Sequence, residues 1–147
     1  MKINSRRILI LTLTLTLIAV SSFAGTTAQP DTGKVTSQVL AKATKSWNGN
    51  TMPAYPEGIP EVTILRIQIP AGTTLPWHTH PVINAGVLIS GELTVTTRSG
   101  KVLEMKAGDP IVEVVDTWHY GKNSGKEPAD IIVFYAGTKG EPITIKE

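Results

Sequence analysis

Residues 72–91 read GTTLPWHTHPVINAGVLISG and place His78 and His80 one residue apart. In an extended strand, residues i and i+2 point to the same face, so both imidazoles can be directed at one point. The chain has three histidines, and the third, His119, lies in residues 108–123, GDPIVEVVDTWHYGKN. Neutral imidazole is a common ligand of zinc, copper, iron and nickel. A lone histidine is more often a core or surface residue, but a same-face pair plus one more indicates a metal site.

The pattern around these histidines is that of an all-β chain. From Glu61 onward, short runs of alternating apolar and polar residues are separated by glycines, which is typical of a sandwich or barrel. We expect irregular structure over 47–60 and no long helix. The expected strands are 38–45, 61–69, 74–80, 85–90, 93–98, 102–106, 111–115, 118–122 and 130–136.

Two ordered motifs resemble those of the cupin superfamily. In the first, Gly72 is followed after five residues by His78-Thr79-His80, after three more by Asn84, and after six more by Gly91. The family has Glu where this chain has Asn84. In the second, running from Gly108 to Asn123, the family has Pro and Gly where this chain has Val114 and Asp116, whereas His119 and Asn123 match. The likeness is closest to small, exported, single-domain bacterial cupins.

This resemblance implies a double-stranded β-helix barrel of the jelly-roll kind, which is often dimeric. It also implies that His78, His80 and His119 are ligands of one divalent metal ion, which could be Fe, Mn, Zn, Cu or Ni. Asn84 stands in the position of the family's carboxylate ligand, and a neutral amide oxygen there should bind the metal more weakly. The metal positions resemble those of cupin dioxygenases that use three histidines.

Glu113 is the candidate catalytic residue. It shares a face with Ile111 and Val115 in the expected strand, so that an inward face would place a carboxylate inside the barrel. A buried carboxylate is costly unless it is paired or bound to a metal. Glu113 is therefore a hypothetical fourth ligand, a partner of a ligand histidine, or a base. The alternative is that a bulge turns it into solvent.

Four other positions bear on the site. Gly86 and Leu88 share the parity of Asn84 and are predicted pocket residues, although Gly86 is equally typical of a packing or bulge glycine. Trp77 and Trp118 directly precede ligand candidates, so parity places them on the opposite face, as core or interface aromatics rather than substrate clamps.

Two further side chains have simpler expectations. Arg66 lies opposite the apolar face of its strand, which predicts a solvent-exposed or externally paired guanidinium. Asn123 is expected to bond to backbone in a turn.

The first 24 residues have the three-part layout of a secretory signal peptide. Lys2, Arg6 and Arg7 precede an apolar run over 8–20, and small residues follow, with cleavage expected after Ala24. The alternative, a membrane anchor, needs about 20 apolar residues. The run fits the general secretory route, although Arg6-Arg7 loosely resembles a twin-arginine signal. We therefore expect a periplasmic or secreted protein, with no stable membrane insertion after signal removal.

The remaining chain is predicted to be a flexible leader over 25–36 and one barrel domain over 37–147. Removal of residues 1–24 leaves 11 basic and 12 acidic residues, a formal net charge of −1. No basic stripe remains, so no nucleic-acid partner is expected. The absence of cysteine excludes disulfides. A homodimer formed through strand 38–45 is expected from the family's habit and from an edge that needs cover.

Two classes of function fit these residues. The first is a metalloenzyme of dioxygenase, isomerase or lyase type, acting on a small molecule such as an organic acid, phenol or diketone. The second is a non-catalytic module that binds a small molecule or metal in the same pocket. One fold can host either function.

Overall fold

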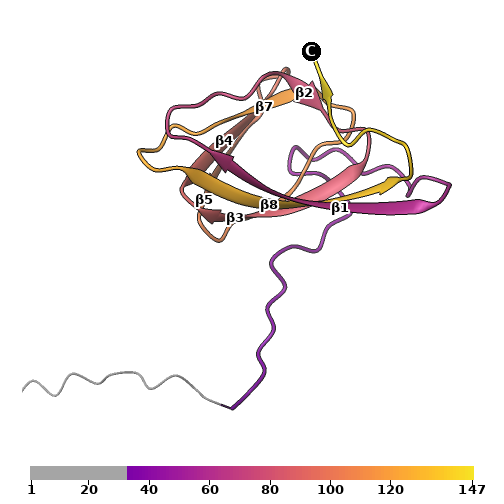
Figure 1. The fold of residues 1–147 in the computed structure, drawn as a ribbon, viewed down its shortest axis with the longest axis horizontal. Coiled ribbons are helices and arrows are strands. Elements are labelled where there is room, and N and C mark those ends of the chain that lie inside the picture. The colour runs from indigo at the N-terminus through magenta and orange to yellow at the C-terminus, as the bar shows by residue number, and fades with distance from the viewer. Residues whose placement is uncertain (1–32) are drawn as a thin grey trace, which may run out of the picture. The chain divides into compact units, whose positions relative to one another are not determined.

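The computed structural model describes residues 33–147, and within them nine strands form two antiparallel sheets (Figure 1). One sheet has the order β1-β8-β3-β6 and the other β5-β4-β7-β2-β9. The strands are β1 (Pro60–Ile69), β2 (His78–Thr79), β3 (Ile83–Ser90), β4 (Glu92–Thr97), β5 (Val102–Lys106), β6 (Pro110–Val112), β7 (His119–Lys122), β8 (Ala129–Thr138) and β9 (Ile145–Lys146). This arrangement confirms the predicted all-β barrel of the double-stranded β-helix kind.

The two sheets enclose an apolar core because their strands alternate in character. In β4, for example, Leu93, Val95 and Thr97 are buried, whereas Glu92 is exposed. Such alternation lets one face of each sheet pack against the other while the outer face stays in water. The buried apolar cluster comprises Ile69, Val82, Leu88, Leu93, Val95, Met105, Ile111, Ala129, Ile131, Val133 and Tyr135.

The longest ladder joins β1 and β8 over ten consecutive residue pairs, from Pro60↔Thr138 to Ile69↔Ala129. Across this ladder the exposed guanidinium of Arg66 in β1 forms a bidentate ion pair with the carboxylate of Asp130 in β8, with contacts of 2.6 to 3.1 Å. The expected external pairing of Arg66 is therefore confirmed.

Glycine is required where the chain passes from one sheet to the other. Gly91, between β3 and β4, has a φ of 78°, and a Cβ there would lie 2.6 Å from the carbonyl oxygen of Pro128. Both the left-handed backbone and the close approach exclude larger residues.

A buried side chain stabilises a second turn. Asn123 Nδ2 donates to the carbonyls of Ile69 and Glu127, as expected for this residue.

Three strand predictions were wrong. Residues 38–45 form no strand, since they are exposed and only Lys45 makes an isolated bridge, to Thr51. Alternation alone does not make a strand without a neighbouring strand to bond with. The expected strands 74–80 and 111–115 shrink to His78–Thr79 and Pro110–Val112, and β9 was not predicted.

Residues Ser37 to Glu147 form one compact unit. The loop at Ser46 and Trp47 packs against the strand edge, where Trp47 N donates to Val112 O at 2.9 Å. No helix in residues 33–147 is long or apolar enough to cross a membrane. The predicted signal peptide lies outside the described residues, as does most of the predicted leader.

Candidate metal centre

The three histidines converge inside the barrel. His78 lies in β2, His80 directly follows it, and His119 begins β7, where it is the cross-strand partner of His78. One ring nitrogen of each histidine lies within 4.8 Å of those of the other two. Thr79, between the first two, is buried but does not line the cavity that the histidines share. The strand alternation that suggested a same-face pair is thus what brings these rings together.

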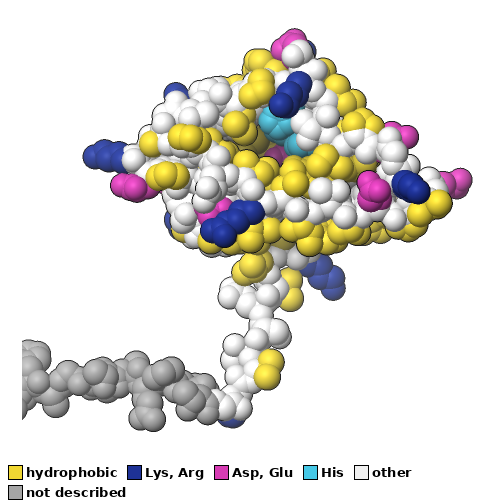
Figure 2. Space-filling model, in the orientation of Figure 1, with side chains coloured by type: hydrophobic (Ala, Val, Ile, Leu, Met, Phe, Trp, Pro, Cys, Tyr) yellow, Lys and Arg dark blue, Asp and Glu magenta, His cyan; other side chains and the backbone are white. Residues whose placement is uncertain are grey.

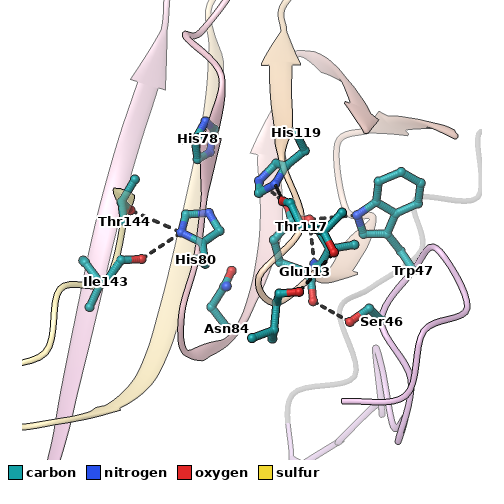
Figure 3. A network of polar contacts seen from close by, with 12 residues as sticks. Ser46, Trp47, His78, His80, Asn84, Glu113, Thr117, His119, Ile143 and Thr144 are labelled. Atoms are coloured by element: carbon teal, nitrogen blue, oxygen red, sulfur yellow. Dashed lines mark hydrogen bonds and ion pairs between the residues drawn. The ribbon is translucent and has the colours of Figure 1, made fainter. Parts of the chain in front are cut away.

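Each imidazole is held by a backbone carbonyl at its Nδ1 atom. The acceptors are Ile143 O for His80 and Thr117 O for His119 (Figure 3), and Pro76 O for His78, each at 2.8 Å. A carbonyl oxygen can only accept, so Nδ1 must carry the proton and a neutral ring leaves Nε2 unprotonated. Three oriented Nε2 lone pairs are what a divalent transition metal requires, and carbonyl tethers of this kind are usual behind metal-binding histidines.

Burial keeps two of these rings neutral. Burial lowers the pKa of His80 to about 4, although the hydrogen bond to the carbonyl of Ile143 acts to raise it. Burial also lowers the pKa of His78. At neutral pH both side chains are therefore in the unprotonated form that can bind a metal ion. The donor set fits the metal that the sequence predicts.

Glu113 lies inside the barrel next to His119. The residue is 8% exposed. Its Oε1 accepts hydrogen bonds from Trp47 Nε1 and from Val114 N, both at 2.8 Å, and its Oε2 lies 3.9 Å from His119 Nε2 (Figure 3). The alternative in which a bulge turns Glu113 into solvent is wrong. The carboxylate has one oxygen fixed by two donors, while the other lies near His119.

Asn84 faces the same cavity. It is 2% exposed, and its Nδ2 donates to Val82 O at 3.3 Å. Among the described residues, no donor reaches its side-chain oxygen. Figure 3 shows the amide lying near His80, on the side of the site away from Trp47.

The two predicted pocket residues do not line this cavity. A Cβ at Gly86 would lie 2.7 Å from the carbonyl oxygen of Ile132, so this glycine permits close packing of β3 on β8. Leu88 is fully buried in the apolar core. Neither residue reaches the cavity, because the backbone of β8 lies against Gly86 and the side chain of Leu88 is part of the apolar core.

The cavity around the histidines has a volume of about 350 Å³. Figure 2 shows the histidines at the bottom of a hollow that hydrophobic side chains surround. Its lining residues are Leu65, Ile67, Ile69, Leu75, Pro76, His78, His80, Asn84, Leu93, Val95, Ile111, Glu113, His119, Gly121, Ile131, Val133, Tyr135, Thr144 and Lys146. The volume suits a small organic molecule.

Three polar residues of this lining were not predicted from the sequence. Tyr135 shares the inward face of β8 with Ile131 and Val133, a parity that could have been used; burial, together with the charge of Glu113, raises its pKa to about 12. Thr144 and Lys146 come from β9 and the residue before it, where the sequence offers no periodic signal.

The predicted outward aromatics lie away from the cavity. Trp77 and Tyr120 pack edge to face with ring centroids 4.7 Å apart. The guanidinium of Arg98 lies over the rings of Trp77 and Trp118, at 5.4 and 4.9 Å from their centroids. None of these aromatic residues lines the cavity, so none is placed to clamp a molecule inside it.

A family model described as Cupin domain matches residues 65–135, which span every one of these histidines. The chain belongs to the cupin superfamily. Among curated proteins, none matches the sequence.

Many solved structures share this cupin's fold. Oxalate oxidase in complex with the substrate analogue glycolate is 26% identical with a TM-score of 0.48, over 58% of this chain and 45% of that one. The formate complex of oxalate decarboxylase from Lactobacillus farciminis is 21% identical with a TM-score of 0.51, over 58% of this chain and 26% of that one. DMSP lyase DddQ from Ruegeria pomeroyi is 19% identical with a TM-score of 0.51, over 58% and 42%. This cupin spans less than half the length of each.

The second cupin motif keeps its geometry despite its departures. Asp116, in the place of the family's glycine, has a φ of 51°, a left-handed conformation that Asp tolerates better than most residues. Its backbone N–H donates to His80 O at 2.9 Å. The turn before His119 is thereby tied to the first motif. Val114, in the place of the family's proline, is fully buried.

Proposed function

We propose that this cupin holds one divalent metal ion with His78, His80 and His119 and is a small-molecule metalloenzyme of dioxygenase, isomerase or lyase type. The observation that carries the proposal is the orientation of the three rings, each fixed at Nδ1 by a carbonyl so that Nε2 is left for a metal. A metal held by three protein ligands keeps open positions, at which it can act as a Lewis acid or activate oxygen.

The surrounding residues supply the remaining parts of a reaction site. Glu113 has one carboxylate oxygen fixed by Trp47 and Val114 and the other directed toward His119, so it can accept a proton from a molecule in the cavity. The apolar walls exclude water around that molecule. Tyr135, whose raised pKa keeps it protonated, can donate a hydrogen bond to it.

The second candidate is a non-catalytic binding module. It is favoured by the scarcity of acid–base groups, because Glu113 is the single carboxylate among the residues that line the cavity. The same cavity and metal would then serve to bind or carry a small molecule.

Export and dimerisation are also proposed. Export rests on the basic, apolar and small-residue succession of residues 1–24. The proposed homodimer rests on the family's habit and on residues 38–45, which are exposed in the single chain and so accessible to a second copy.

Metal content tests the site directly. Elemental analysis of the protein purified from its native compartment should give about one metal ion per chain, and a His78→Ala/His80→Ala variant should give none. Thr79→Val is the matched control, because this residue lies between the two histidines but does not line their cavity, and its hydroxyl has no hydrogen-bond partner among the described residues. No metal in the folded wild type would overturn the proposal.

Activity separates the two candidates. The metal-loaded protein would be tested for turnover and oxygen consumption with catechols, diketones and thiols. An enzyme consumes at least one of these compounds, and the histidine variant does not. A binding module shows ligand-dependent shifts in melting temperature without turnover.

A further inference from the structure

The cavity that holds the histidines contains one acidic and one basic lining residue besides them. Glu113 is buried, and two hydrogen bonds engage its Oε1. Lys146 is exposed, and among the described residues it makes no ion pair. Figure 2 shows a basic side chain at the rim of the hollow, directly beside the histidines. The lining therefore has one positive charge at the exposed end, from Lys146, and one buried carboxylate, that of Glu113.

Strand β9 fixes this lysine over the metal centre. Lys146 is the cross-strand partner of His78, so the two side chains leave the sheet on the same face. Thr144, two residues earlier, also lines the cavity, and its hydroxyl lies 3.2 Å from His80 Nδ1. One ammonium and one hydroxyl thus stand beside two of the metal-binding rings.

Contacts with the rest of the barrel hold β9 in place. Glu147 N donates to Trp77 O at 3.1 Å, and the Glu147 carboxylate pairs with Arg98, which also lies over Trp118. This pairing has a second effect. The acid next to Lys146 in the sequence is engaged outside the barrel, so it leaves the ammonium available to a ligand.

We propose that the molecule that enters this cavity is a small monocarboxylate, bound at its charged end by Lys146 and Thr144. An ammonium–carboxylate hydrogen bond is about twice as strong as a neutral one. The walls beyond are apolar, with Leu75, Leu93 and Val95 among them, which suits an organic body and not a second charge. One lysine matches one negative charge. This inference takes the cavity of the proposed function and names its ligand class, but it does not require that a reaction occurs.

Matched acids and amides test the proposal. Dissociation constants for acetate, acetamide, benzoate and benzamide would be measured by calorimetry, on metal-free and zinc-loaded protein. We expect at least one acid to bind wild type about tenfold more tightly than its amide, and Lys146→Met to remove that difference. Lys146→Arg should retain it. Lys139→Met, which removes an exposed lysine that does not line the cavity, should bind like wild type.

The outcomes separate this inference from the proposed function. If the Lys146→Met variant keeps its metal but loses the preference for the acid, both stand. If wild type holds no metal and still prefers the acid through Lys146, the metal proposal fails and the ligand class stands. If neither acid binds wild type more tightly than its amide, or if Lys146→Met retains the preference, the inference is wrong.

Discussion

The Nδ1 atom of His80 lies 2.8 Å from the carbonyl oxygen of Ile143, 63 residues later in the chain. This contact makes the segment around β9 part of the candidate metal centre, since it sets which nitrogen of His80 carries the proton. The same segment pairs with β2 at His78 and Thr79 and contributes Thr144 and Lys146 to the cavity. A change that displaces β9 should therefore alter metal binding as well as ligand binding.

The stability of the metal-free protein should fall in mild acid because of His80. Burial lowers its pKa to about 4 in the folded chain, whereas the free side chain has a pKa of 6.5. Between these values the unfolded chain binds a proton that the folded chain does not, so the free energy of unfolding decreases as pH falls from 6.5 to 4, by at most about 3 kcal/mol. His78, whose pKa is also lowered, acts in the same direction.

Urea unfolding of chelator-treated protein at several pH values between 7.5 and 4 would measure this loss. His80→Gln is the comparison, because the remaining titratable groups are kept. We expect a smaller decrease in the variant than in wild type. Equal decreases in the two proteins would show that His80 is not the cause.

Removing the charge of Glu113 should weaken metal binding. Glu113→Gln can keep the two hydrogen bonds to Oε1 and loses the negative charge 3.9 Å from His119 Nε2. Groups this close to a metal-binding histidine typically change affinity by about 10- to 100-fold. Competition with a chromogenic chelator would measure the change. Unchanged affinity and unchanged thermal stability would mean that Glu113 has no role at the site.

Trp47→Phe separates the support of Glu113 from its charge. The variant removes the Nε1 donor to Oε1 and leaves a buried carboxylate with one hydrogen bond fewer. We expect a loss of about 1–3 kcal/mol in the free energy of unfolding, measured by urea denaturation. Metal affinity should fall less than in Glu113→Gln. A larger fall would indicate that the tryptophan, rather than the charge, controls the site.

The barrel and its histidines follow from local patterns, which is why the sequence could predict them. Alternation put His78 and His80 on one face, and the same rule put Glu113 inward with Ile111. The predictions were wrong where strand formation depends on pairing with a segment that is distant in the sequence. Residues 38–45 alternate but have no neighbouring strand, whereas β9 has almost no pattern and forms because β2 offers it an edge. Lys146 and Thr144 could not be assigned to the cavity without that pairing.

Gly86→Ala should destabilise the barrel and leave the metal site intact. The added Cβ would lie 2.7 Å from the carbonyl oxygen of Ile132 and 3.2 Å from Val133 Cγ2, so β3 and β8 must separate. Overpacking of this kind costs about 1–3 kcal/mol. Thermal unfolding would measure the loss, with Gly33→Ala as the control, since a Cβ there meets no atom within 4 Å. Loss of metal by a folded Gly86→Ala protein would mean that Gly86 belongs to the site after all.

Asn84→Asp should have opposite effects with and without metal. The introduced carboxylate has the shape of the amide but is 2% exposed, and without a cation a buried charge should cost about 2–4 kcal/mol of unfolding free energy. With a divalent metal present, the same group offers the oxygen ligand that the family's glutamate supplies, so metal affinity should rise by about tenfold.

Melting temperatures of chelator-treated and metal-loaded protein would show both effects. Asn48→Asp is the matched control, because Asn48 is also buried but does not line the cavity. Its destabilisation should be the same in the two states, whereas metal should rescue Asn84→Asp and stabilise it by more than it stabilises wild type. If metal stabilises Asn84→Asp no more than wild type, the side chain at position 84 does not reach the bound ion, and Asn84 is not a ligand.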